Sequence, residues 1–234
     1  MGIALSFLPF FDICKEKRAL LGPVLGLGSL EMADRISDLN AFAEANNYRD
    51  FKKYPSIRNL FRERYCIENY KDCDINDKAE LQIDLSQSLP EELIGSMHTV
   101  INGGTIEHIF DIATAFKNIH LITKLGGTII HLSPVTWYNH GFFNINPRLH
   151  SLVAKENSYE LLTEAFCFMR YNENGEIDDS TSLHIIFNKN EISEEIKRVD
   201  SVMQKYSLPT NILHFVAYRK IKSNSFKKPY DIQY

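Results

Sequence analysis

With 234 residues and a mass of 27.0 kDa, the chain has room for one substantial α/β domain, and we expect residues 1–234 to form a single domain. Hydrophobic residues make up 44% of the chain and charged residues 24%, which excludes the disordered and collagen-like classes. A net charge of −4 without a long basic run argues against nucleic acid as a partner, because phosphate backbones require clustered Lys and Arg.

The N-terminal segment 1–18 is interpreted as an extension that contributes to a lid over the acceptor. Its apolar stretch Leu5–Phe11 has no basic region before it and is interrupted by Pro9, so it does not have the pattern of a signal peptide. No apolar run reaches the roughly 18 residues that a membrane span needs. The four cysteines form no CxxC pair, so neither a zinc site nor a disulfide framework is indicated. We therefore expect a cytoplasmic protein.

The first half of the chain predicts alternating strands and helices. Ala19–Leu27 is a short apolar run that predicts a buried strand, and Ser29–Ala45 has helical apolar spacing with Ser29 as its cap. A short helix is expected near Ile57–Arg64, followed by strands over Glu80–Leu85 and Met97–Asn102. Strands that alternate with helices in this way predict a parallel sheet.

The second half continues the pattern. Apolar residues recur at helical spacing from Thr105 to Lys124, where Gly126-Gly127 is expected to stop the helix, and Gly126–Leu132 predicts another buried strand. The remaining expected elements are helices over Pro147–Lys155 and Glu191–Tyr206 and strands over Glu160–Tyr171, Leu183–Asn188 and Ile212–Ile221.

Ligands of parallel α/β sheets bind at the carboxyl ends of the strands, where glycine-rich turns let the backbone approach. The first expected strand ends in Gly26-Leu27-Gly28-Ser29, and the strand at 97–102 ends in Asn102-Gly103-Gly104-Thr105. Both segments are therefore candidates for ligand binding.

The middle of the chain carries a family resemblance. The blocks Val100–His108 and Leu125–His131, followed by Asn139–Phe142 and Asn146-Pro147, resemble a group of bacterial SAM-dependent (S-adenosyl-L-methionine-dependent) class I methyltransferases associated with surface and capsular polysaccharide biosynthesis. One member type that the resemblance leaves open for this chain is the methyltransferase for the O-methyl phosphoramidate decoration of capsular polysaccharide. The resemblance covers roughly residues 24–157.

The resemblance implies a fold and a reaction. The fold is α/β: a Rossmann-like three-layer sandwich with a mostly parallel seven-stranded sheet, an antiparallel C-terminal strand and helices on both faces. The reaction is in-line transfer of a methyl group from SAM, which leaves S-adenosyl-L-homocysteine, to an oxygen of a small acceptor. That acceptor is a sugar, a sugar nucleotide or a phosphoramidate intermediate.

The family pattern also assigns cofactor contacts. A carboxylate after the second strand binds the ribose hydroxyls, and Asp72 is the first choice with Asp74 next. Asp84-Leu85 fits the adenine contact. The remaining contacts lie in the two glycine turns: Gly26, Gly28, Ser29, Asn102, Gly103, Gly104 and Thr105. The first turn departs from the family, because Gly26 stands where an acidic residue is usual and Leu30 and Met32 stand where glycines are usual.

Catalysis depends on the acceptor. A sugar hydroxyl has a pKa far above neutral and calls for a general base, whereas a phosphate or phosphoramidate oxygen is already anionic. His140, in an aromatic-rich loop, is the first candidate for the base and His108 the second, with Glu107 beside it. Glu107 and His108 point about 100° apart on a helix, so one is expected to face the cofactor and the other the sheet. No HxxxH or HExxH spacing is present, so metal independence is expected.

Two alternatives stay open. A short-chain NAD(P)-dependent oxidoreductase is suggested by the GxxxGxG spacing of residues 22–28, but the Tyr-x-x-x-Lys pair that this class needs after the fifth strand is missing at Tyr138, Tyr159 and Tyr171. A methyltransferase-like protein that binds SAM or a partner without turnover is suggested by the degenerate first glycine turn.

Overall fold

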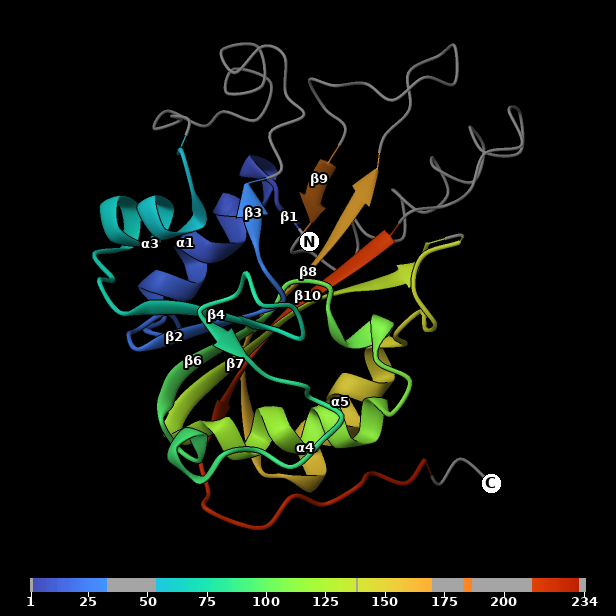
Figure 1. Cartoon of the computed structure of the whole chain (residues 1–234). Coiled ribbons are helices and arrows are strands. Elements are labelled where there is room, and N and C mark those ends of the chain that lie inside the picture. Colours follow the sequence, from blue (N-terminus) through green and yellow to red (C-terminus); the bar gives the residue numbers. More distant parts are fainter. Residues whose placement is uncertain (1, 33–53, 138, 170–182, 187–211, 232–234) are drawn as a thin grey trace, which may run out of the picture.

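The computed structural model describes residues 2–32, 54–137, 139–169, 183–186 and 212–231 (Figure 1). The first elements are β1 (Gly2–Ile3), η1 (Leu5–Phe7), α1 (Leu8–Glu16), β2 (Val24–Leu27), β3 (Glu31–Met32), α3 (Ile57–Tyr65), β4 (Tyr70–Asp74), β5 (Leu81–Gln82) and η2 (Glu91–Leu93). They are followed by β6 (Met97–Asn102), η3 (Ile106–His108), α4 (Ile112–Ile122), β7 (Thr123–Thr136), α5 (Pro147–Glu156), β8 (Tyr159–Met169), β9 (Leu183–Ile186) and β10 (Ile212–Lys220).

One large sheet organises the described residues, with the strand order β5-β4-β2-β6-β7-β10-β8-β9. The five strands from β5 to β7 are parallel, and β10 pairs antiparallel with both β7 and β8. The expected fold class is therefore confirmed for seven strands. The eighth, β9, adds an antiparallel hairpin partner at the edge beside β8.

Apolar cores lie on both faces of this sheet, so the described elements form three layers. Successive residues of the central strands alternate between the cores: Ile101 and Ile130 pack on one face, whereas Val100 and Ile129 pack on the other. Helices α1 and α3 cover the first face, and α4 and α5 cover the second (Figure 1). Burial on both faces of the sheet explains why a central parallel strand such as β2 is a continuous apolar run.

The N-terminal segment is part of the helical layer. Phe10 of α1 packs edge-on against Phe215 of β10, with ring centroids 5.5 Å apart, and Phe7 contacts the same ring at 4.7 Å. These phenylalanines are buried. Residues 2–16 therefore contribute to the core rather than extend from it, whereas a lid function for this segment stays a prediction. Among the described helices, none is both long and apolar enough to cross a membrane.

Several expected elements have different bounds in the structure. The expected helix Ser29–Ala45 does not begin at Ser29, because Glu31–Met32 forms β3 and pairs in parallel with β1; residues 33–45 lie outside the described residues. The expected first strand is shorter, since β2 begins at Val24 after the cis peptide between Gly22 and Pro23. The expected strand Glu80–Leu85 contains only the two-residue β5.

The expected helix Thr105–Lys124 is divided in two. The turn η3 ends at His108, and α4 begins after Asp111, whose side chain accepts a hydrogen bond from the backbone N–H of Thr114. A side-chain cap of this kind fixes a new helix start. The helix then ends at Ile122, and Gly126-Gly127 lie within β7 rather than at a helix stop.

The other elements follow the sequence closely. Helices α3 and α5 match their expected ranges to within one residue at each end, and so does β10. The expected strands at 160–171 and 183–188 correspond to β8 and β9 as far as the described residues extend, and the expected helix Glu191–Tyr206 lies outside them.

Candidate active site

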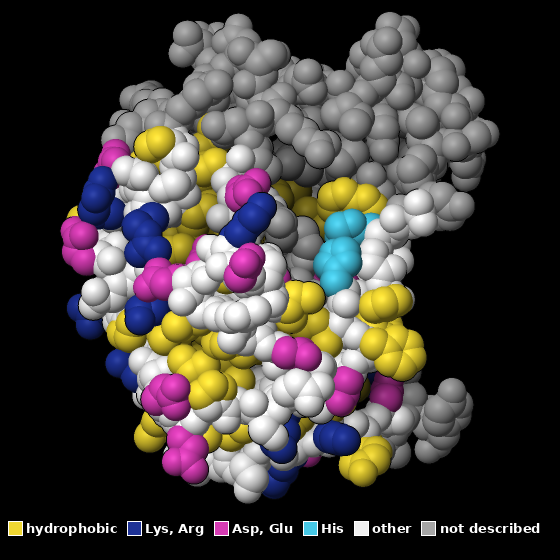
Figure 2. All heavy atoms as spheres, in the orientation of Figure 1, with side chains coloured by type: hydrophobic (Ala, Val, Ile, Leu, Met, Phe, Trp, Pro, Cys, Tyr) yellow, Lys and Arg dark blue, Asp and Glu magenta, His cyan; other side chains and the backbone are white. Residues whose placement is uncertain are grey.

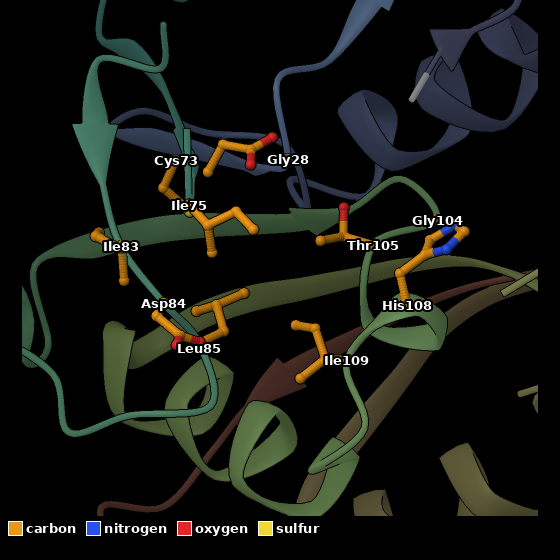
Figure 3. Close-up of a pocket in the computed structure, with 11 residues that line it drawn as sticks. Gly28, Cys73, Ile75, Ile83, Asp84, Leu85, Gly104, Thr105, His108 and Ile109 are labelled. Carbon is orange, nitrogen blue, oxygen red and sulfur yellow. The ribbon is translucent and has the colours of Figure 1, made fainter. Parts of the chain in front are cut away.

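A cavity of about 300 Å³ opens at the carboxyl ends of the parallel strands (Figure 3). Its walls come from the turns after β2, β4 and β6 and from the segment after β5, and its lining residues are Gly28, Cys73, Asp74, Ile75, Ile83, Asp84, Leu85, Gly104, Thr105, His108 and Ile109. Figure 3 shows Ile83 and Asp84 at one end and His108 at the other. This is the edge at which open parallel sheets bind their ligands.

Of the two acidic residues predicted for the ribose contact, Asp74 lines the cavity and Asp72 does not. Asp74 is the last residue of β4, and its carboxylate accepts a hydrogen bond from the backbone N–H of Ser29 at 3.0 Å. Hydrogen bonds from backbone N–H groups lower the pKa of Asp74, although its partial desolvation acts in the opposite direction. Asp72 lies inside the strand, where its carboxylate instead accepts from the N–H of Glu80.

The predicted adenine contact is also at the cavity. Asp84 and Leu85 both line it, and the carboxylate of Asp84 accepts hydrogen bonds from the side chain and backbone N–H of Ser86 at 2.7 and 2.8 Å. These bonds lower the pKa of Asp84. The site therefore presents an ionised carboxylate at each of two places, Asp74 and Asp84, with the apolar side chains of Ile75 and Leu85 beside them.

Two glycines of the predicted set permit close packing of the turns. Gly28 has φ +78°, and a Cβ there would lie 2.7 Å from the hydroxyl oxygen of Thr105. Gly104 has φ +92° and lines the cavity with Gly28. A residue with a side chain would be strained at both positions.

The side chain of Leu30 packs against one glycine of each glycine turn, Gly26 and Gly103. Methyl carbons of Leu30 lie 2.8 Å from the positions that a Cβ would occupy at Gly26 and at Gly103. Neither glycine lines the cavity, and Ser29 does not line it either. Leu30 therefore fills the space beside both glycines, and at Gly26 the hydroxyl of Tyr70 fills it as well.

The buried side chain of Asn102 stabilises the turn after β6 through hydrogen bonds. Its side-chain oxygen accepts hydrogen bonds from the N–H groups of Thr105 and Ile106, and its amide nitrogen lies 3.3 Å from the hydroxyl of Ser133. The residue is fully buried and does not line the cavity. Thr105 lines it and donates its hydroxyl to the carbonyl of Leu27, which links the turns after β6 and β2.

The three residues predicted for catalysis lie together beside the cavity. The Nε2 atom of His140 is 3.5 Å from Oε1 of Glu107, and the rings of His140 and His108 are 4.8 Å apart. His108 lines the cavity, whereas Glu107 is buried below the loop that carries His140. Figure 2 shows histidine side chains gathered on this face with hydrophobic side chains beside them. Glu107 and His108 were expected to face the cofactor and the sheet separately, but a ligand atom of each lies within 4.8 Å of one on the other and on His140.

The protonation of this cluster follows from desolvation. Burial raises the pKa of Glu107 to about 7. Burial lowers the pKa of His140, and the neighbouring His108 lowers it further; burial likewise lowers the pKa of His108. Both imidazoles are therefore neutral near pH 7 and have a lone pair available.

Backbone contacts fix the loop of His140 against η3. The N–H of Phe142 donates to the carbonyl of Glu107 at 2.8 Å, and Gly141 adopts φ +65° with its Cα so close that a Cβ would lie 2.8 Å from the same oxygen. The indole of Trp137 stacks on the His140 ring at 4.6 Å. Sequence reasoning named these residues separately, but the proximity of Glu107 and His140 depends on this loop contact, which no spacing pattern records.

Comparisons with known proteins identify similar folds among solved structures. No family model matches the chain, and no curated protein matches it. Among solved structures, a proposed methyltransferase from Bacillus halodurans C-125 aligns with a TM-score of 0.52 and 11% identity, over 91% of this chain and 100% of its own.

Two further structures score slightly lower. A SAM-dependent methyltransferase from Archaeoglobus fulgidus has a TM-score of 0.49 and 14% identity, over 92% of this chain and 94% of its own. Phosphoethanolamine N-methyltransferase 2 from Haemonchus contortus, in complex with S-adenosyl-L-methionine, has a TM-score of 0.49 and 12% identity, over 92% of this chain and 53% of its own. The sheet topology and the first of these likenesses together show that the chain has the Rossmann-like methyltransferase fold.

Proposed function

We propose that this protein is a SAM-dependent methyltransferase that methylates an oxygen atom of a small acceptor. The observation that carries the proposal is the cavity at the carboxyl ends of β2, β4 and β6, with Asp74 and Asp84 at its wall and the Glu107–His108–His140 cluster at its edge. A fold alone assigns no activity, so the argument depends on these residues.

The residues of the cavity fit the adenosine half of SAM. Asp74 is suited to two adjacent ribose hydroxyls because one ionised carboxylate accepts from both donors. Asp84 is suited to the exocyclic amine of adenine, and Ile75 and Leu85 offer apolar surface to the ring. Gly28 and Gly104 let the backbone approach the ligand. The fit is poorer at the methionine end, where Gly26 offers no carboxylate for the amino group and Leu30 fills the adjacent space.

The cluster at the edge of the cavity supports acceptor activation. When bound, SAM supplies a methyl group on a positively charged sulfur, which is an electrophile that needs no further activation. The protein must then align the acceptor, exclude water and remove a proton from a hydroxyl acceptor. Neutral His140 accepts that proton on Nδ1, and Glu107, 3.5 Å from Nε2, stabilises the resulting imidazolium. His108 is the second candidate for this role.

The finer acceptor assignment is a sugar, a sugar nucleotide or a phosphoramidate intermediate of surface or capsular polysaccharide biosynthesis. Its support is the resemblance of the segments at 100–108, 125–131, 139–142 and 146–147. The first of them includes the turn after β6, and the third lies in the loop of His140. An acceptor that is already anionic would not need a base. The rate change on His140→Ala therefore distinguishes a hydroxyl acceptor from a phosphoramidate oxygen.

Calorimetric titration with S-adenosylhomocysteine tests the cofactor. We expect micromolar binding, no binding of NAD or NADP, and a loss of at least about tenfold in affinity for Asp74→Asn. Asp72→Asn is the matched control, because Asp72 does not line the cavity. Binding of a nicotinamide cofactor in place of S-adenosylhomocysteine would make the protein an oxidoreductase and contradict the proposal.

A methyltransferase-like protein without turnover is the second candidate. The observation that favours it is the side chain of Leu30 above Gly26 and Gly103. Equal affinity for adenosine and for S-adenosylhomocysteine would support this candidate, because it would mean that the amino-acid end of the ligand contributes nothing to binding. A preference of about tenfold or more for S-adenosylhomocysteine would support the enzyme.

A further inference from the structure

We propose that Glu107, His108 and His140 bind a divalent transition-metal ion, with Zn²⁺ as the best match, at the edge of the cavity. Each residue offers one ligand atom, and the three atoms all lie within 4.8 Å of one another. The proposal does not rest on methyl transfer, since metal binding is measured on the protein alone.

The spacing of the ligand atoms is close to that around a single ion. Zn²⁺ binds imidazole nitrogen and carboxylate oxygen at about 2.0–2.2 Å, so two ligands of a tetrahedral ion lie about 3.4 Å apart. Nε2 of His140 and Oε1 of Glu107 are 3.5 Å apart. His108 is exposed, so its ring has room for the small rotation that completes the set.

The state of Glu107 is an independent observation that points to a ligand. The residue is 0% exposed, and among the described residues neither carboxylate oxygen has a hydrogen-bond partner. A buried carboxyl group without a partner is costly, and proteins normally pair such groups or let them coordinate a metal. A cation held between Glu107 and the two imidazoles would satisfy the carboxylate in place.

The surroundings hold the ligands in position before any ion binds. The carbonyl of Glu107 accepts from the N–H of Phe142, so the backbone of η3 is fixed to the loop that carries His140. Trp137 stacks on the His140 ring with an interplanar angle of 24°. Supporting contacts of this kind are what metal sites need to keep their ligands in place.

Two histidines and one carboxylate select the chemistry of the ion. Nitrogen and oxygen donors of this kind suit Zn²⁺, Fe²⁺ and Co²⁺, whereas Mg²⁺ and Ca²⁺ prefer all-oxygen sites. Three protein ligands leave at least one coordination position open for water or an acceptor oxygen. Because His108 also lines the cavity, an acceptor bound to the ion would lie next to the cofactor site. An ion there would lower the pKa of the acceptor hydroxyl so that its proton could pass to bulk water, and His140 would be a ligand rather than the proton acceptor.

The sequence predicts metal independence because HxxxH and HExxH motifs are absent. The proposed metal site does not depend on either motif. The cluster combines adjacent residues of one turn with a histidine from a distant loop. Backbone hydrogen bonds from Phe142 and Phe143 to the carbonyl of Glu107 hold that loop against the turn.

The test uses the full chain without an affinity tag, stripped with a chelator and titrated calorimetrically with Zn²⁺. We expect one strong site of micromolar affinity or tighter, and Co²⁺ at the same site should produce d–d absorption bands in the visible range. His140→Ala, His108→Ala and Glu107→Gln should each weaken Zn²⁺ binding at least tenfold. His98→Ala, a half-buried histidine outside the cluster, is the matched control and should retain the wild-type affinity.

Circular dichroism verifies that each variant is folded, and S-adenosylhomocysteine binding is a second control for His140→Ala and Glu107→Gln, whose side chains do not line the cavity. The proposal is overturned if the wild-type protein does not bind Zn²⁺, or if all three cluster variants bind it as the wild type does. Loss of binding in His98→Ala to the same extent would also overturn it. Failure to bind S-adenosylhomocysteine with intact Zn²⁺ binding would contradict the proposed function and leave this inference standing.

Discussion

Two histidine clusters lie among the described residues, and their histidines and carboxylates differ in burial. Beside the cavity, the carboxylate of Glu107 is buried and its two histidines are half-buried or exposed. Across β7, α5 and β10, the histidines His131, His150 and His214 are buried, and Glu164, the carboxylate next to them, has a side chain that is 25% exposed. In the first cluster the carboxylate is buried and the histidines are more exposed, whereas in the second the histidines are buried and the carboxylate is more exposed.

Their hydrogen bonds differ in the same way. In the buried cluster, Nε2 of His214 lies 2.8 Å from the Glu164 carboxylate, and Nδ1 of His150 lies 3.3 Å from Nδ1 of His214. His131 has the side-chain amide of Asn102 at 3.4 Å and stacks on His150 at 4.5 Å. Each ring thus has a polar neighbour within the protein, although Nε2 of His150 has no hydrogen-bond partner, whereas both oxygens of the Glu107 carboxylate lack one among the described residues. We infer that a cluster whose rings contact one another inside the core is structural, whereas one that leaves both oxygens of a buried carboxylate without a hydrogen bond beside a cavity is suited to a ligand.

The largest expected effect comes from removing a ring of the open cluster. If the acceptor is a hydroxyl, His140→Ala should lower kcat/KM for methyl transfer by about 100-fold or more, because the base or the metal ligand is lost. S-adenosylhomocysteine affinity should change less than about threefold, since His140 does not line the cavity. His150→Phe, its counterpart in the buried cluster, should leave the rate within about threefold. Equal losses for both variants would remove the distinction between the clusters.

The next effect concerns stability. Burial without a partner destabilises the ionised form of Glu107, so in EDTA at pH 8 Glu107→Gln should raise the free energy of unfolding by about 1–3 kcal/mol in urea denaturation. In saturating Zn²⁺ this advantage should shrink by at least about 1.4 kcal/mol, because the variant binds the ion at least tenfold more weakly and gains correspondingly less stability from it. A variant that is less stable than the wild type in both buffers would show that the carboxylate has a structural partner.

Because of the buried histidine cluster, we expect the free energy of unfolding to decrease at acidic pH. Burial lowers the pKa of His131 to about 3, whereas the unfolded value is about 6.5, so the unfolded chain binds more protons between these pH values. The stability contribution of His131 is present above pH 6.5 and is lost as the pH falls. Between pH 7.5 and pH 5 the loss is about 2 kcal/mol, and His131→Asn should remove it. Urea denaturation at both pH values measures this, and an unchanged pH slope in the variant would contradict the assignment.

The smallest effect concerns the loop contact. Gly141→Ala should cost about 1 kcal/mol for its positive φ and should also weaken Zn²⁺ binding about tenfold, because the added methyl group would push the loop away from Glu107. Gly95→Ala is the matched control, since Gly95 has φ +64° but nothing within 4 Å of the added Cβ. If both variants bind Zn²⁺ equally, the loop contact does not position His140.

Sequence patterns predicted the centre of the sheet best. The region from β6 to β7 is rich in buried apolar residues, and its strand-turn-helix-strand order was readable although the break at Asp111 was not. By contrast, β4 has the sequence Tyr-Lys-Asp-Cys-Asp, which lacks the apolar run of a buried strand. Without the bounds of that strand, Asp72 and Asp74 were indistinguishable, and the first choice was the residue that does not line the cavity.

The sequence predicted which residues belong to the candidate site, but it did not predict how close together they lie. Glu107, His108 and His140 were all expected near the reaction on the basis of their place after strands. The left-handed conformation of Gly141 and the stacking of Trp137 on His140 bring them together, and neither has a periodic signature in the sequence. The sequence showed only that Leu30 stands where the methyltransferase pattern has a glycine. It did not show that the leucine side chain packs against Gly26 and Gly103.

A crystal structure of the protein with S-adenosylhomocysteine and Zn²⁺, with anomalous data at the zinc edge, tests most directly that a cofactor cavity and a metal-binding cluster form one active site. The account predicts adenosine density between Asp74 and Asp84 and an anomalous peak within bonding distance of Glu107, His108 and His140. Density for the nucleoside outside this cavity, or a cluster without an anomalous peak at saturating Zn²⁺, would contradict it.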